Sequence, residues 1–415
     1  MRRIKFIQKV IIGAIMIILA FFAYLYPPIN NRLAWRVDLA LTYLRGMVKP
    51  PNGIPTPLPQ PTLTSAPTTT FTPIPTRTAT PPGPTSTPLP SLTPFPAQVS
   101  LPAPAYERQD LNNCGPATLA MDLRFFGWKG NQTDISKIIR PGQDDRNVTA
   151  EELAYYVRNY VGWLNIEYRM GGTVDTLRKF LASGFPVMIE EGTLVDKPYW
   201  PNDDQWAGHY LLLIGYDDPT QTFEVQDSYH EAIKSVSYAG TEKNWQAFNH
   251  VYILVFLPNQ SKMIQGLFGE DWNVDTNRQH ALDATRAVTK EEPKNGFAWF
   301  NLGTNLVYFD SYAEAALAYD NARNAGLPQR MLLYQFGPYF AYFNAARYDD
   351  LLTLTNYILQ LPSHPSSEEA WLWHGWALYR KGDRAGAQGD FEMALIENPH
   401  SKDAQYALDF LKNNP

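Results

Sequence analysis

The chain has 415 residues, with 35 lysines and arginines against 41 aspartates and glutamates and a formal net charge of −6. At ~150 residues per domain, this length allows two domains and further segments. The charges are spread evenly and leave no basic field for a phosphate backbone, which argues against nucleic acid as a partner. The 34 prolines predict that part of the chain is extended.

Residues 1–26 predict an uncleaved membrane anchor. The basic stretch MRRIKFIQK precedes an uncharged apolar run, VIIGAIMIILAFFAYLY at 10–26, close to the ~17–25 residues of a spanning helix. The run is longer than in a signal peptide, and no small-residue cleavage site follows it. The basic residues before it favour a single-pass protein of the cell membrane, with a cytoplasmic N-terminus and the other domains outside. A buried core helix is the alternative interpretation.

Residues 27–98 are predicted to separate this anchor from the folded domains. Residues 27–48 place apolar side chains among three arginines, which fits a short amphipathic helix on the outer membrane surface or a simple stem. From 49 to 98, Pro, Thr and Ser dominate. Proline removes N–H donors and fixes φ, and the lack of apolar mass prevents a core. This segment is therefore predicted to be a disordered, semi-rigid stalk.

Residues 99–258 have the composition of a folded domain. The first helix is predicted to begin in NNCGPATLAM, at Cys114, the one cysteine of the chain. Asn113 is the expected N-cap and Pro116 fits the first turn. Free N–H groups and the positive end of the helix dipole stabilise a thiolate. Cys114 is therefore a candidate nucleophile, with a small buried residue as the alternative.

A nucleophilic cysteine needs a base, and three of the seven histidines lie in this domain: His209, His230 and His250. The stretch GHYLLLIGYDD predicts a buried strand that begins at His209. The turn DDPTQ and the strand TFEVQD then predict a hairpin that returns Asp227 to the same end. A carboxylate there fixes the imidazole tautomer and stabilises the charged ring. His250 also opens an apolar strand, but it lacks the preceding glycine and the hairpin-linked aspartate, so we interpret it as structural.

Gln109, NNCGPATLAM, GHYLLLIGYDD and VQDSY, in this order, resemble the papain-like cysteine peptidases of the bacteriocin-processing type, and more closely their stand-alone relatives. The resemblance implies an α+β papain-like fold and cleavage of peptide bonds, in the best-known members after double-glycine leaders. It implies Cys114 as nucleophile, His209 as base and then acid, and Asp227 as orienting carboxylate. Gln109 would donate to the oxyanion beside the Cys114 backbone N–H. It stands five residues before the cysteine, whereas the family pattern has six.

Other elements between these motifs fit an α+β layout. A helix is predicted near 149–160, followed by a helix that ends at Gly184 and a strand that begins at Pro186. A polar and aromatic loop before His209 is expected to border the substrate cleft. The loop residues are Trp200, Asp203, Asp204, Gln205 and Trp206.

Residues 276–415, after a linker at 259–275, carry a repeat. Trp299, Gly303, Ala315 and Tyr319 are matched 72 residues later by Trp371, Gly375, Ala387 and Phe391, with a degenerate copy between them. The pattern resembles tetratricopeptide repeats and predicts about three helical hairpins. Small residues let paired helices approach while aromatic rings fill the space between them. An all-α solenoid that binds a protein partner or substrate is expected.

The sequence therefore predicts a membrane-anchored, extracytoplasmic cysteine peptidase that acts on a peptide or protein substrate. Two alternatives remain: a catalytically silent papain-like module that binds peptides or acts as a scaffold, and a peptide ligase with the same triad. No glycine-rich phosphate loop and no zinc-spaced histidines occur, and GQDDRN at 142–147 lacks calcium-ligand spacing. No cofactor or metal is predicted.

Overall fold

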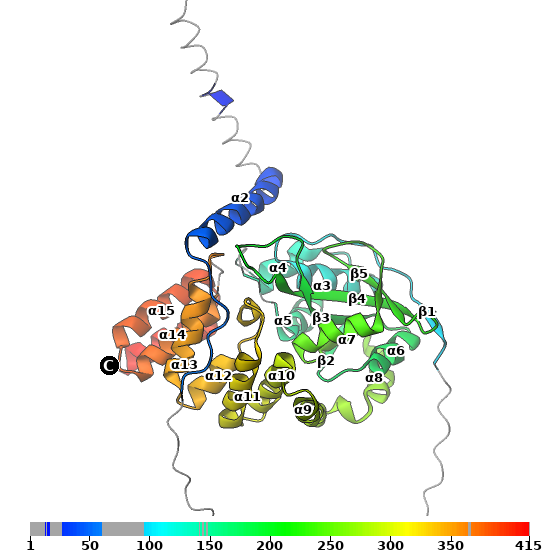
Figure 1. The fold of residues 1–415 in the computed structure, drawn as a ribbon. Helices are drawn as coiled ribbons and strands as arrows, with labels where there is room; N and C mark the ends of the chain where they lie inside the picture. Colours follow the sequence, from blue (N-terminus) through cyan, green and yellow to red (C-terminus); the bar gives the residue numbers. More distant parts are fainter. Residues whose placement is uncertain are drawn as a thin grey trace, which may run out of the picture.

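The computed structural model describes residues 13, 15, 16, 27–59, 95–140, 142, 145, 146, 148–363 and 367–414. Within these, an α/β region and an all-helical C-terminal region lie side by side (Figure 1). The predicted combination of an α+β domain with a helical C-terminal region is confirmed at this level.

One antiparallel sheet forms the centre of the α/β region, in the order β2–β7–β3–β4–β5–β6, with β1 paired to the end of β4. The strands are β1 (Gln98–Ser100), β2 (Asn165–Arg169), β3 (Val187–Leu194), β4 (Trp206–Asp217), β5 (Thr222–Asp227), β6 (Lys234–Ser237) and β7 (Tyr252–Phe256). The helices around it are α3 (Cys114–Phe125), α4 (Gln132–Ile139), α5 (Ala150–Tyr156), α6 (Val174–Ala182), α7 (Tyr238–Trp245) and α8 (Ser261–Phe268). Shorter helical segments are η1 (Val157–Val161), η2 (Gln246–Phe248), η3 (Pro258–Gln260) and η4 (Gly269–Trp272).

Strand β4 is buried on both faces, which explains its continuous apolar run. Leu212 and Ile214 belong to one core cluster with residues of α3 and α5. Leu211 and Leu213 belong to a second cluster with residues of α6 and α8. Because successive side chains of a strand point to opposite faces, helices cover the sheet on both sides.

The predicted linker at 259–275 is wrong, because most of this segment is helical. It contains α8 and η4, and Ile264 and Phe268 of α8 are buried. The Phe268 ring lies 5.1 Å from the ring of Phe180 and 5.9 Å from that of Tyr252. This segment therefore completes the second core of the α/β region.

The C-terminal region consists of paired helices. They are α9 (Val274–Glu291), α10 (Gly296–Tyr308), α11 (Tyr312–Ala325), α12 (Gly337–Asn344), α13 (Tyr348–Leu359), α14 (Glu368–Arg380), α15 (Arg384–Glu397) and α16 (Lys402–Asn413), with the short η5 (Met331–Leu333) between α11 and α12. A Cβ on Gly303 would lie 2.7 Å from the Tyr319 ring, and one on Gly375 would lie 2.6 Å from the Phe391 ring. Small residues therefore lie where paired helices approach, while the tetratricopeptide assignment stays a prediction.

The two regions share one core. Phe248 of η2 belongs to the same buried cluster as Phe300 and Leu306 of α10. At this junction Asn249 Nδ2 donates to Asn305 Oδ1 over 2.8 Å, and both side chains are buried. The helical region is therefore built onto the α/β region through buried contacts.

Residues 27–48 form helix α2 (Pro27–Val48), which contacts the folded regions near its C-terminal end (Figure 1). A Cβ on Gly46 would lie 2.4 Å from Trp200 Cβ, so the two backbones are in close contact. Thr42 of the same helix is fully buried. The segment is helical, and its placement on the membrane surface or as a stem stays a prediction.

Residues 49–59, predicted as the start of a free stalk, instead lie along the helical region. Arg323 Nε donates to the Pro55 carbonyl over 2.8 Å, and the Leu58 N–H donates to Asp350 Oδ1 over 3.0 Å. The stalk prediction is wrong at this end because backbone groups here find charged partners. Residues 60–94 lie outside the described residues.

In the described part of the chain, no helix combines the length and apolarity that crossing a membrane requires. Apart from residues 13, 15 and 16, the predicted anchor at 1–26 lies outside the described residues. The anchor therefore stays a prediction.

Candidate active site

Cys114 is the first residue of α3. Asn113 occupies the N-cap position but does not cap the helix with its side chain; its Nδ2 donates to Gln132 Oε1 over 2.6 Å. This bond ties the turn before α3 to α4. A Cβ on Gly115 would lie 3.3 Å from Val148, so a small residue follows the cysteine. The thiol is free and half-buried, at the positive end of a helix.

His209 is the fourth residue of β4, not the first as predicted, because β3–β4 pairing extends back to Trp206. The side chain is buried, and its Nε2 lies 2.9 Å from Asp227 Oδ1. Asp227 is the last residue of β5. The β4–β5 hairpin thus brings together the histidine and the aspartate that the sequence singled out.

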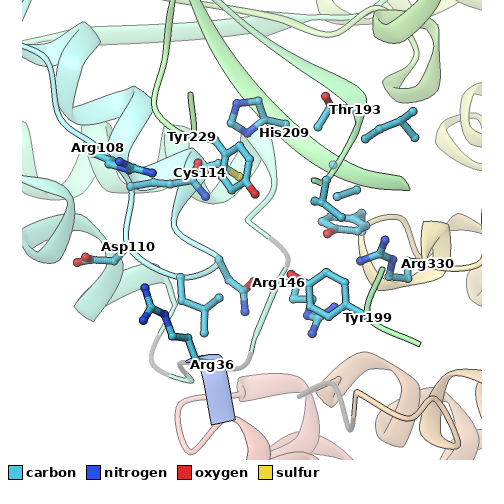
Figure 2. A pocket seen from close by; sticks show the side chains of 18 residues that line it. Arg36, Arg108, Asp110, Cys114, Arg146, Thr193, Tyr199, His209, Tyr229 and Arg330 are labelled. Atoms are coloured by element: carbon cyan, nitrogen blue, oxygen red, sulfur yellow. The ribbon is translucent and has the colours of Figure 1, made fainter. Parts of the chain in front are cut away.

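Cys114 and His209 line the same pocket and lie close to each other (Figure 2). Because Nε2 is bonded to Asp227, Nδ1 is the ring nitrogen that remains for the thiol. Burial lowers the pKa of His209, but hydrogen bonds to Asp227 and Cys114 and the charges of both groups raise it from 6.5 to about 10. The ring is therefore protonated at neutral pH, which favours an ion pair with the sulfur.

Asp227 has partners that were not predicted. Its Oδ2 lies 2.7 Å from His230 Nδ1 and accepts from Lys234 Nζ over 3.1 Å. Its Oδ1 also accepts from the backbone N–H groups of Tyr229 and His230 over 3.0 and 3.1 Å. Burial raises the pKa of Asp227, but the bonds and charges of His209 and His230 outweigh it and lower this pKa far below its ordinary value. The carboxylate is therefore ionised throughout the physiological pH range.

Gln109 lines the pocket beside Cys114. Its backbone N–H donates to the Ser228 carbonyl over 2.9 Å, and Ser228 Oγ donates to Gln109 Oε1 over 3.0 Å. Because Oε1 is occupied, the side chain presents Nε2, which has no hydrogen-bond partner among the described residues. Ser228 directly follows Asp227 in the sequence, and this position is the sequence feature from which the contact with Gln109 could have been predicted. The oxyanion role of Gln109 stays a prediction.

Two consecutive glutamates of β3, Glu190 and Glu191, lie across from Tyr210 and His209 of β4. These two residues were not predicted from the sequence. Glu191 pairs in register with His209, and Glu190 Oε2 accepts from the Tyr210 hydroxyl over 2.9 Å. Burial raises the pKa of Glu191 to about 7, against the opposing effect of His209. Burial also raises the pKa of Glu190 well above its ordinary value. Asp227, whose pKa is lowered, is the ionised carboxylate that holds His209.

The helical region contributes to the pocket, which has a volume of about 710 Å³. Arg330 and Tyr334, from the segment between α11 and α12, line it together with residues of the α/β region. The Tyr334 ring lies edge-on to Trp206, with 5.6 Å between centroids. A Cβ on Gly208 would lie 2.8 Å from Tyr334 Cδ1. The glycine before His209 therefore leaves room for a tyrosine of the helical region.

The loop predicted to border the cleft reaches the pocket at its two ends and also contacts the helical region. None of Trp200, Asp203, Asp204, Gln205 and Trp206 lines the described pocket, although their neighbours Tyr199 and Ala207 do. Trp200 Nε1 donates to Gln329 Oε1 over 2.9 Å, and Asp203 lies 3.2 Å from an Arg330 guanidinium nitrogen. Gln205 Nε2 donates to the Val195 carbonyl over 2.8 Å. The loop therefore borders the pocket through Tyr199 and Ala207, while the five named side chains pack against neighbouring segments.

His250 does not line the pocket. Its Nε2 lies 2.9 Å from Glu242 Oε1, and its ring packs edge-on against Trp245 with 5.1 Å between centroids. Within the described ranges, no group of three or more His, Cys, Asp or Glu side chains is arranged to hold a metal ion.

Residues 97–253 match the Peptidase_C39 like family. The match contains Gln109, Cys114, His209 and Asp227 and ends before the helical region. It agrees with the resemblance to bacteriocin-processing peptidases and does not extend to the proposed repeats. No curated protein matches the chain.

Three of the solved structures with similarity to the chain are the following. A C39-like protein from Bacillus anthracis is 17% identical, with 38% of this chain and 97% of that chain covered and a TM-score of 0.30. Xylellain, a cysteine protease from Xylella fastidiosa, is 14% identical, with 40% and 87% covered and a TM-score of 0.30. The peptidase domain of Streptococcus ComA, a bifunctional ABC transporter, is 13% identical, with 36% and 95% covered and a TM-score of 0.28.

Proposed function

We propose that the protein is a cysteine peptidase that hydrolyses peptide bonds. Cys114 is the nucleophile, His209 the general base and acid, and Asp227 the carboxylate that orients the ring. The observation that carries this proposal is the placement of His209 between Asp227 and Cys114 at the wall of an open pocket. The match of residues 97–253 to the Peptidase_C39 like family supports it.

In the acylation step, the Cys114 thiolate attacks the carbonyl carbon of the substrate and the carbonyl π pair moves onto oxygen. The Cys114 backbone N–H and Gln109 Nε2 donate to this oxyanion. When the C–N bond breaks, the Nδ1 proton of His209 passes to the leaving nitrogen. A thioester and a neutral histidine result.

In the second step, neutral His209 takes a proton from water, whose oxygen attacks the thioester carbon. The C–S bond breaks, the carboxyl product leaves, and the thiolate and the protonated ring are restored. Asp227 holds the ring through Nε2 in both steps, so Nδ1 faces the sulfur each time.

The cellular setting is part of the same proposal. Residues 10–26 anchor the chain in the cell membrane with the N-terminus inside, and the peptidase and helical regions lie outside. The helical region binds a protein partner or the protein substrate through tetratricopeptide-like surfaces. This setting follows from the apolar run and the repeat pattern of the sequence.

Peptide cleavage by the full chain in detergent micelles tests the proposed activity. We expect the wild type to cut members of a peptide library and Cys114→Ala to cut none. His250→Ala is the matched control, because His250 has a carboxylate partner but does not line the pocket. Equal cleavage by wild type and Cys114→Ala, or no cleavage of any peptide by wild type, would overturn the proposal and favour a scaffold.

A peptide ligase forms the same thioester, so an added amine separates the two reactions. With a dipeptide amine present, a peptidase gives mainly the carboxylic acid, whereas a ligase gives mainly the new amide. Mass spectrometry of the products distinguishes them.

A further inference from the structure

Three arginines line the pocket beside Cys114, and none of them has an acidic partner among the residues that the structure describes. Arg36 comes from α2, Arg108 from the segment before α3, and Arg146 from the segment before α5 (Figure 2). Among the described residues, none of their guanidinium groups makes a hydrogen bond or an ion pair. Several arginines elsewhere in the fold pair with carboxylates, among them Arg124, Arg169, Arg178, Arg323 and Arg347.

Arg146 is held in place without being neutralised. Its guanidinium carbon lies 4.8 Å from the centroid of the Tyr199 ring, which also lines the pocket. Its Nε is buried without a hydrogen-bond partner. A cation over an aromatic face keeps its N–H donors for another acceptor. Arg146 is therefore an oriented donor at the pocket wall.

The other charges near the pocket do not cancel these three arginines. Asp110 is the carboxylate among the described lining residues, and it is exposed. The fourth lining arginine, Arg330, is paired with Asp203. The Asp227 charge is shared by His209, His230 and Lys234. In a chain of net charge −6, the described residues that line the pocket at the thiol therefore carry an excess of positive charge.

We propose that this pocket selects acidic peptides, which carry Asp or Glu side chains next to the cleaved bond. This specificity rests on the proposed peptidase function. A guanidinium presents two parallel N–H donors that match the two oxygens of a carboxylate. Arg36, Arg108 and Arg146 line part of the pocket in which a substrate at Cys114 would lie.

One of the three arginines comes from outside the residues that match the peptidase family. Arg36 belongs to α2, whereas the match covers 97–253. Helix α2 is held on the folded regions by the close contact between Gly46 and Trp200. The N-terminal segment therefore supplies part of the proposed specificity.

Paired peptides that differ only in Asp or Glu against Asn or Gln, next to the cleaved bond, test this proposal with the full chain. We expect kcat/KM to favour the acidic member. Each exposed arginine–carboxylate pair contributes a factor of roughly 1.4 to 5. Raising NaCl from about 0.05 to 0.5 M is expected to reduce the preference, because salt screens exposed charges.

Single variants assign the preference to the arginines. Arg36→Gln, Arg108→Gln and Arg146→Gln should each lower the acidic-to-neutral ratio of kcat/KM. Arg45→Gln is the matched control, because Arg45 is exposed on the same helix as Arg36 but does not line the pocket. Thermal unfolding of each variant checks that it folds.

Binding to Cys114→Ala separates this proposal from the peptidase function. We expect labelled acidic peptides to bind this variant more tightly than their neutral partners, by fluorescence anisotropy. Cleavage by wild type without an acidic preference would overturn the specificity and leave the peptidase function intact. Preferential binding without any cleavage would overturn the peptidase function and support acidic recognition. Equal binding of both peptides would overturn acidic recognition.

Discussion

The Asp227→Asn variant removes the charge that holds His209. Asp227 accepts three hydrogen bonds on Oδ1 and two on Oδ2. An asparagine side chain has one acceptor oxygen, and its NH2 group cannot accept. If that oxygen keeps the Oδ1 contacts, the bonds from His230 and Lys234 are lost.

The expected change in the free energy of unfolding is estimated from the loss of these two hydrogen bonds. Hydrogen bonds to charged groups contribute ~1.5–3 kcal/mol each. The side chains of His230 and Lys234 are 32% and 33% exposed, so water screens part of this contribution. We therefore expect the free energy of unfolding to fall by about 2 to 3 kcal/mol, measured by urea denaturation.

The same substitution changes the charge state of His209. Asp227 helps to raise the pKa of His209 to about 10, so its removal should return this pKa toward 6.5. The ring then loses its proton at neutral pH, and we expect kcat/KM at pH 8 to fall ~10²- to 10⁴-fold. The alkaline limb of the pH–rate profile should also move to lower pH. Glu242→Gln, which breaks the carboxylate–histidine pair of His250, is the control.

A pH–rate profile of Asp227→Asn that superimposes on the wild-type profile would contradict the role of Asp227 in setting the charge of His209. NMR titration of the His209 ring gives a second reading that does not depend on turnover. An unchanged ring pKa in the variant would show that Asp227 does not set the charge of His209.

Three further predictions concern packing and pH. Gly208→Ala should lower both Tm and kcat/KM, because its Cβ would lie 2.8 Å from Tyr334 Cδ1 and overpacking costs about 1–3 kcal/mol; wild-type values of both would contradict the contact. Gly303→Ala has a similar conflict at 2.7 Å and should lower Tm, whereas Gly266→Ala, with nothing within 4 Å, is the control and should be neutral or stabilising. Because the folded-state pKa of His209 is raised to about 10, its contribution to stability is full below about 6.5 and is lost as pH rises through about 10. Urea denaturation at pH 7, 9 and 10.5 should therefore show a steeper loss for wild type than for His209→Gln, and parallel losses would contradict the raised pKa.

The sequence predicts those parts of the fold that depend on local signals. Pro116 and the apolar spacing after it predict the start of α3 at Cys114, and the turn between β4 and β5 predicts the hairpin. These features act over a few residues, so their physical cause is present in the sequence itself. The approach of His209 to Asp227 follows from that hairpin.

Contacts between distant segments were not predictable in the same way. Tyr334 reaches the pocket from a region whose own pattern indicates only helix packing. The segment with Ile264 and Phe268 has too short an apolar pattern to show that it completes a core. Glu190 lies within β3 and looks like an ordinary polar strand residue, whereas its burial, which raises the pKa of its carboxyl, depends on distant packing. In each case the role of the residue depends on the residues that it packs against, and these lie far away in the sequence.

Residues around Asp227 make some contacts that depend on the local sequence and some that depend on distant pairing. His230 and Ser228 lie within three residues of Asp227 in the sequence. Polar contacts of these two side chains near the end of β5 could therefore have been predicted from the local sequence. Lys234 reaches the same carboxylate from β6 and needs the β5–β6 pairing.

Trapping of the acyl-enzyme is the most direct test of Cys114 as the nucleophile. A peptide substrate is mixed with the full chain, the reaction is quenched with acid within milliseconds to seconds, and the intact mass is measured. Peptide mapping of the quenched sample then locates the adduct, and because Cys114 is the one cysteine of the chain, a thioester can form only there. We predict an adduct with the mass of the N-terminal product on the wild type and none on Cys114→Ser. Peptide cleavage without an adduct on the wild type, or an adduct of the same mass on another residue, would contradict the account.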